Sequence, residues 1–169
     1  MRLHAFLPLL LSAITSTTAS DSPSQLTTWE QIHQTLHTYP LAVDFKQASL
    51  YPQVFANDAF ANYTGPLANL TGIDAIREGL MASVASLISQ HQLGTTVIDI
   101  HDDGVSANST TYFTATLFTL MPNQMGSRDY TILYGLYSDQ LKLVQNEGWR
   151  ISTRYLEFMA PNLGNLTLG

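Results

Sequence analysis

The sequence predicts an α+β fold, in which helices fill the first half of the chain and antiparallel strands fill the second. Apolar residues recur at helical spacing up to about residue 90, and β-branched and aromatic residues dominate from there onward. The 169 residues carry no internal repeat and no low-complexity linker, and this length suits one domain of ordinary size. We therefore expect a single α+β domain over residues 21–169.

The first half of the domain is expected to begin with helices and a short strand. Thr27 or Thr28, followed by Glu30, can cap a helix through "TTWEQIHQTLHTY", which Pro40 should end. The stretch "LAVDFKQASLYPQVF" reads as one or two short helices broken at Pro52. The stretch "AFANYTG" reads as a short strand that ends in a turn.

A third helix is expected over residues 73–90, where apolar residues keep the i, i+3, i+4 rhythm of a buried helix face. The residues that carry this rhythm are Ile73, Ile76, Leu80, Val84, Leu87 and Ile88. His91 would then lie where the helix hands over to a strand, and Gly94 would let the chain turn sharply.

The second half reads as four strands separated by turns. The stretch over residues 93–104 is a strand that ends in the hairpin signal Asp103-Gly104. Longer strands are expected over residues 105–121, 129–144 and 149–159, and "QNEG" should form the turn between the last two.

Strand alternation predicts which side chains face the helices. They are Ala107, Ser109, Thr111, Phe113, Ala115 and Leu117 on the first long strand, Leu133, Gly135, Tyr137, Asp139, Leu141 and Leu143 on the second, and Trp149, Ile151, Thr153 and Tyr155 on the last. A carboxylate such as Asp139 on an otherwise apolar face is costly unless it is paired or functional.

The N-terminus has the layout of a secretory signal peptide over residues 1–20: a short basic start, an apolar run and small residues before a cleavage point. An uncleaved anchor is the alternative, and after cleavage we expect no stable membrane span. Four N-x-S/T sequons support a secreted or lumenal location, and their expected glycosylation sites are Asn62, Asn69, Asn108 and Asn165.

Composition excludes several classes of function. The chain has no cysteine, so thiol nucleophiles, thiolate zinc sites and iron–sulfur clusters are excluded. A net charge of -6 disfavours nucleic acid as a partner. His33 and His37 share a helix face at i, i+4, but no third ligand accompanies them, so we expect no metal. No phosphate loop, nucleophile elbow or nucleotide motif is present.

Five stretches of the chain, taken in order, resemble the nuclear-transport-factor-2-like superfamily. They are "VDFKQASLYPQVFANDAF", "GIDAIREGL", "HQLGTT", "YGLYSDQL" and "EGWRISTR". The similarity is greatest to its SnoaL-like polyketide cyclases and to scytalone dehydratase. This resemblance implies a cone-shaped, curved antiparallel sheet wrapped around three N-terminal helices, with an apolar pocket inside the cone. Members of the superfamily often dimerise through the outer face of the sheet, so a homodimer is one expectation, and glycans at Asn108 on that face would compete with it. The residues expected to be exposed there are Tyr112, Phe118, Tyr130, Ile132 and Tyr134.

The resemblance also assigns candidate catalytic residues. Asp44 matches a helix aspartate at the pocket. His91 matches the catalytic histidine of scytalone dehydratase, which begins an "H-x-x-G" motif after the third helix there as well. The alternatives are a solvated helix aspartate and a histidine at a helix end. The strand over residues 105–121 lacks the second histidine of that enzyme and has Thr111 or Tyr112 in its region, whereas Asp139 makes the chain more similar to the cyclases.

The function implied is cofactor-independent acid–base catalysis on a small apolar, polyketide- or terpenoid-like metabolite: dehydration, isomerisation, cyclisation or epoxide opening. Asp44, His91 and Asp139 would move protons. The residues expected to bind the substrate are Tyr51, Thr111, Phe113, Tyr137, Trp149 and Tyr155. The alternative is a non-catalytic secreted module that binds a small lipophilic ligand. Asp58 is expected to have a structural role at a turn.

Overall fold

The computed structural model describes residues 26–119 and 129–166. Its helices are α1 (Thr28–Asp44), α2 (Tyr51–Val54) and α3 (Ile73–Ser83), with short 3₁₀ turns at Ala48–Leu50 and Gly65–Leu67. Its strands are β1 (Phe55–Asn62), β2 (Leu70–Thr71), β3 (Leu87–Ile100), β4 (Ser106–Thr119), β5 (Tyr130–Val144), β6 (Gly148–Phe158) and β7 (Leu163–Gly164). The predicted leader over residues 1–20 lies outside the described residues.

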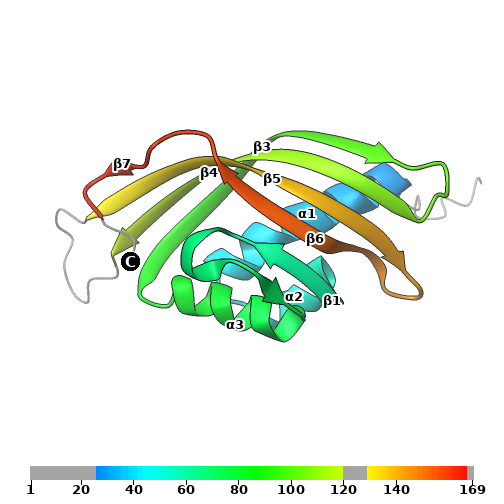
Figure 1. Ribbon diagram of the computed structural model, residues 1–169, viewed down its shortest axis with the longest axis horizontal. Helices are drawn as coiled ribbons and strands as arrows, with labels where there is room; N and C mark the ends of the chain where they lie inside the picture. Colours follow the sequence, from blue (N-terminus) through cyan, green and yellow to red (C-terminus); the bar gives the residue numbers. More distant parts are fainter. Residues whose placement is uncertain (1–25, 120–128, 167–169) are drawn as a thin grey trace, which may run out of the picture.

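One strongly curved, unclosed sheet covers the three helices, which confirms the predicted α+β class (Figure 1). Its strand order is β2-β1-β6-β5-β4-β3, and β7 pairs with β5 beyond the end of β6. The sheet is antiparallel, as predicted, at every pairing except that between β1 and β6, which are parallel. The chain leaves β1 through α3 and a four-strand meander, and this long crossover returns β6 alongside β1 in the same direction.

The first helix is longer than predicted. Thr27 and Glu30 form the expected capping box, but α1 continues through Pro40 to Asp44. A proline inside a helix removes a hydrogen bond and crowds the preceding turn. Here Pro40 and the following Ala42 and Val43 are buried against the sheet, and this burial offsets the cost. The consequence is that Asp44 becomes the last residue of a long, well-packed helix.

The third helix is shorter than predicted, since α3 ends at Ser83 and β3 begins at Leu87. The apolar residues after Ser83 fit a helical rhythm, but Val84 is buried in a turn, Leu87 is buried at the start of β3, and Ile88 faces outward. His91 therefore lies within β3 rather than at a hinge, and it faces the helices with Leu87 and Ser89. The chain does not turn at Gly94; β3 has a bulge between Leu93 and Thr96.

The predicted inward faces are confirmed on β4 and on β5 as far as Leu141, while Leu143 near the end of β5 is 42% exposed. On β6 the prediction fails halfway. Ile151 pairs with Leu141, but the next pair is Thr153 with Gln140, so Ser152 forms a bulge. The bulge reverses the alternation, so that Tyr155 points outward at 52% exposure and its neighbour Arg154 points inward.

No helix among residues 26–119 and 129–166 is long and apolar enough to cross a membrane. Of the four predicted glycosylation sites, Asn69, Asn108 and Asn165 are exposed. Asn62 is half-buried, and its side-chain oxygen accepts a hydrogen bond from the backbone N–H of Thr64. Glycosylation therefore stays a prediction at all four positions.

Candidate active site

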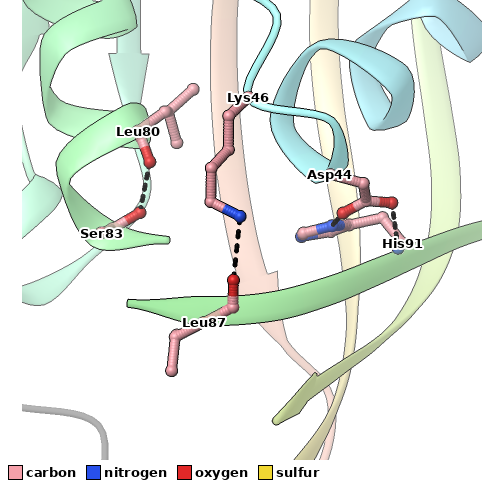
Figure 2. Close-up of polar contacts among 6 residues, drawn as sticks. All are labelled: Asp44, Lys46, Leu80, Ser83, Leu87 and His91. Atoms are coloured by element: carbon pink, nitrogen blue, oxygen red, sulfur yellow. Dashed lines mark hydrogen bonds and ion pairs between the residues drawn. The ribbon is translucent and has the colours of Figure 1, made fainter. Parts of the chain in front are cut away.

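The end of α1 meets the middle of β3 through two hydrogen bonds to one carboxylate. Oδ1 of Asp44 lies 2.7 Å from Nδ1 of His91, and Oδ2 accepts the backbone N–H of His91 at 2.7 Å (Figure 2). The two side chains are 13% and 10% exposed, respectively. Asp44 and His91 are 47 residues apart in sequence, and the structure brings them together as a dyad.

The geometry of the dyad determines which nitrogen of His91 can act as a base. An ionised carboxylate only accepts hydrogen bonds, so the Nδ1 of His91 carries the proton and donates it to Asp44. The lone pair of the neutral imidazole is then on Nε2. Partial burial raises the pKa of Asp44, but the hydrogen bonds and the charge of His91 outweigh this and lower it. The ionised form of Asp44 is thereby favoured as the partner of the imidazole.

A lysine just after α1 forms a second contact between the end of this helix and β3. The Nζ of Lys46, two residues beyond α1, donates to the backbone oxygen of Leu87 at 2.9 Å (Figure 2). This bond and the dyad join the end of α1 to β3 at two points, four residues apart on the strand. The position of His91 is thus determined by its backbone as well as by its side chain.

Aromatic rings line the inner side of the dyad. The ring of Tyr39 lies edge-on to the His91 ring at 6.2 Å, and the ring of Phe113 lies at 6.5 Å. Phe113 stacks on Tyr137 with 4.4 Å between ring centres. Gly135, the cross-strand partner of Phe113, makes room for this stack, because a Cβ there would lie 2.6 Å from the Phe113 ring.

Behind these rings lies a buried ion pair. Nε and Nη2 of Arg154 each donate to one oxygen of Asp139 at 2.7 Å, and the side chains are 1% and 0% exposed. The guanidinium carbon lies 4.3 Å from the ring centre of Tyr39 and 4.2 Å from that of Tyr137. Burial lowers the pKa of Arg154, but the charge and hydrogen bonds of Asp139 outweigh it and raise that pKa well above its usual value.

This ion pair changes the role expected of Asp139. The carboxylate faces inward, as predicted, but both of its oxygens already accept hydrogen bonds from Arg154. The carboxylate is fully buried and both oxygens are held by the guanidinium, so in this structure Asp139 is the partner of Arg154. Arg154 was missed because a regular hairpin register would place Thr153, not Arg154, opposite Asp139, and the bulge at Ser152 moves the pairing by one residue.

The remaining predicted binding residues are scattered. Phe113 and Tyr137 lie in the aromatic wall, and Thr111 is buried on β4 with no partner for its hydroxyl. Tyr51 is buried on α2, where its ring stacks on Phe55. The backbone oxygen of Trp149 accepts a hydrogen bond from the hydroxyl of Thr35 on α1. Tyr155 faces away from the helices. Of the six, Phe113 lies beside the dyad and Tyr137 stacks on it, and the predicted inward orientation of Tyr155 is wrong.

The largest side chains of the interior fill the inside of the curved sheet, where the apolar pocket was predicted. They are Arg154, Tyr39, Tyr51, Tyr137 and Phe55. A cavity of about 470 Å³ lies instead on the outer sheet face, lined by Gln92, Gly94, Tyr112, Phe113, Thr114, Tyr134, Gly135 and Met159. A second, polar cavity of about 350 Å³ lies between α1 and the β5–β6 turn. Neither is lined by Asp44 or His91.

The buried tyrosines of this interior make the protein sensitive to alkali. Burial raises the pKa of Tyr51 to about 12, and burial likewise raises the pKa values of Tyr39, Tyr63 and Tyr137. A raised pKa favours the protonated, folded form, so this stability is complete below about pH 10 and is lost as pH rises through the folded pKa values. Tyrosinate absorbance of these four should appear together with loss of the folded circular dichroism signal. Their ionisation in a still-folded chain would contradict this.

No group of three or more metal-ligating side chains lies together within the described residues. The rings of His33 and His37 stack at 4.0 Å on α1, with Trp29 stacked on His33. Asp58 is exposed and pairs with Lys142 at 2.7 Å.

The sequence and the fold were compared with known protein families and solved structures. Residues 24–155 match the SnoaL-like domain family. No protein with a curated description matches the chain. A solved scytalone dehydratase-like protein of Novosphingobium aromaticivorans superposes with a TM-score of 0.66 at 20% identity, covering 82% of this chain and 88% of its own. Hexachlorocyclohexane dehydrochlorinase LinA, type 2, gives 0.69 at 9% identity, covering 82% and 89%. A nuclear transport factor 2-like protein of Salmonella enterica gives 0.65 at 18%, covering 79% and 92%.

Proposed function

Because the chain belongs to the SnoaL-like domain family, we propose that it is a cofactor-independent enzyme that transfers protons on a small apolar molecule. His91 is the general base, and Asp44 orients it and stabilises its charged form. The observation that carries this proposal is the two-point contact between Asp44 and His91. The similarity in fold to a dehydratase-like protein and to a dehydrochlorinase supports it.

The reaction begins at Nε2 of His91. This nitrogen takes a proton from a carbon or oxygen of the substrate, while Asp44 holds Nδ1–H and balances the positive charge of the imidazolium. Return of the proton to another carbon gives isomerisation, and return to a leaving hydroxyl gives dehydration. In a cyclisation the carbanion attacks a carbonyl carbon of the same molecule, and the imidazolium protonates the alkoxide that forms. In epoxide opening it protonates the epoxide oxygen as the C–O bond breaks. The aromatic wall of Tyr39, Phe113 and Tyr137 suits an apolar, polyketide- or terpenoid-like ring.

The proposal is tested by deuterium incorporation from D₂O into a panel of small cyclic ketones, β-diketones and β-hydroxy ketones, followed by mass spectrometry. An enzyme of this class exchanges carbon-bound hydrogen at its reaction site even when the full reaction is reversible or slow. Incorporation into at least one ring class, above the rate in buffer, is the expected result. Exchange at the buffer rate for every compound would reject the catalytic role of His91.

The second candidate is a non-catalytic module that binds a lipophilic ligand. The observation that favours it is the filled interior, since neither of the two cavities described above is lined by Asp44 or His91. Ligand binding without deuterium exchange in the same panel would support this alternative.

A secretory location remains a proposal that rests on the leader and the four sequons. Intact mass of the protein from a eukaryotic secretory host should show a start near residue 20 and a decrease after glycosidase treatment. An intact Met1 without any change in mass would contradict it.

A homodimer is also proposed, and the exposed side chains of Tyr112, Tyr130 and Tyr134 on the outer sheet face support it.

A further inference from the structure

The end of α1 contacts β3 at two points, and a buried serine lies between them. The Nζ of Lys46 donates to the backbone oxygen of Leu87, and the carboxylate of Asp44 accepts the backbone N–H of His91 at 2.7 Å (Figure 2). Ser89 is the middle residue of this stretch of β3. It is 8% exposed and shares the inner face of the strand with Leu87 and His91. The chain from Asp44 to Lys46 therefore runs past this serine.

The hydroxyl of Ser89 has no other role in the described part of the chain. Its oxygen is buried and makes no hydrogen bond of regular geometry within residues 26–119 and 129–166. A buried hydroxyl without a partner is destabilising, and a serine hydroxyl turns to suit a nearby acceptor. The carboxylate of Asp44 can accept it, because an ionised carboxylate offers about four lone-pair sites and the two bonds from His91 occupy two of them.

The same hydroxyl affects the ionisation of Asp44. Partial burial raises the pKa of Asp44, whereas the hydrogen bonds and the charge of His91 lower it, and the nearby hydroxyl of Ser89 lowers it further. His91 is the titratable group that faces the carboxylate from β3, while Lys46 directs its ammonium to Leu87. Ser89 is therefore close enough to act on the carboxylate, and it does so without carrying a charge.

We propose that Ser89 is a positioning residue of the dyad, whose hydroxyl donates a third hydrogen bond to the carboxylate of Asp44. This inference rests on the proposed function and adds one residue to its machinery. A third donor restricts rotation of the carboxylate and stabilises its negative charge. Nδ1–H of His91 then stays directed at Asp44, and the lone pair of the ring stays on Nε2, where the proposed base needs it. Ser89 acts through Asp44 and keeps its own proton.

The protonation equilibrium of Asp44 tests this contact without a substrate. Carbon-13 resonances of the aspartate carboxyls are followed from neutral pH downward, and the resonance of Asp44 is identified by its absence from the Asp44→Asn variant. Removing a donor to the ionised form brings a lowered pKa back toward its ordinary value. Ser89→Ala should therefore raise the titration midpoint of Asp44 by about half a pH unit or more. At neutral pH, where acid does not unfold the chain, the resonance of Asp44 should also change position.

Ser109→Ala is the matched control. Ser109 is also a buried serine whose hydroxyl has no hydrogen-bond partner within the described residues, but it lies on β4 opposite Asp139. Its removal should leave both the midpoint and the neutral-pH resonance of Asp44 unchanged. An Asp44 signal that Ser89→Ala does not affect, or that both substitutions affect equally, would overturn the proposal.

Deuterium exchange separates this inference from the proposed function. In an active protein, Ser89→Ala should lower kcat by about threefold or more and leave KM unchanged, because Ser89 does not touch the substrate. If the unaltered protein catalyses no exchange, the proposed function fails, and the carbon-13 titration still decides whether Ser89 binds Asp44. If exchange occurs and Ser89→Ala retains the full rate, the proposed function stands and Ser89 is not a positioning residue.

Discussion

Replacing His91 with alanine should lower the rate of deuterium exchange by about 100-fold or more. The substitution removes the nitrogen that accepts the proton, and no other histidine contacts Asp44 within the described residues. Asp44→Asn should lower the rate nearly as much, because an amide can donate to Nδ1 and so favour the tautomer in which Nε2 carries the proton. Rates are compared on the substrate class that shows the fastest exchange with the unaltered protein.

His101→Ala is the matched control for this experiment. His101 lies one residue beyond the end of β3, where it is exposed and contacts Ser106 and Asn108. Its removal should leave the exchange rate unchanged. Nitrogen-15 spectra of the unaltered protein should show the neutral His91 ring protonated on Nδ1. A ring protonated on Nε2, or a His91→Ala variant with the full rate, would contradict the assigned roles.

Replacing Arg154 with methionine should destabilise the fold by about 3–5 kcal/mol. The substitution leaves the carboxylate of Asp139, which is fully buried, without its cation. Changing both residues, Asp139→Leu with Arg154→Met, should recover most of this loss, because a well-packed apolar pair needs no charge partner. Urea unfolding followed by circular dichroism measures the free energy of unfolding of each variant.

The exposed pair formed by Lys142 and Asp58 provides the comparison on the same sheet. Lys142→Met should change the free energy of unfolding little, since surface ion pairs contribute little to stability. A single Arg154→Met variant as stable as the unaltered protein would show that Asp139 finds another partner or a proton. A double variant as unstable as the single one would show that the aromatic rings around the guanidinium, rather than its charge, determine stability.

The sequence by itself determined the features that repeat over short distances. The i, i+2 alternation of β4 and β5 depends only on neighbouring residues, so the inward positions of Phe113, Tyr137 and Asp139 could be predicted. The capping box at Thr27 and the hairpin at Asp103-Gly104 are likewise local. Asp44 and His91 became candidates through family resemblance, because the two residues are 47 positions apart and no local rule connects them.

Tertiary structure decided where these local patterns stop. Pro40 would end an isolated helix, but burial of the following turn keeps α1 intact and carries Asp44 to β3. The apolar residues after Ser83 suit a helix or a strand, and pairing with β4 makes them a strand that directs His91 inward. The bulge at Ser152 aligns Arg154 with Asp139, because a buried carboxylate is tolerated only when a cation reaches it. Each of these outcomes depends on contacts between distant segments, which the order of residues along one segment does not contain.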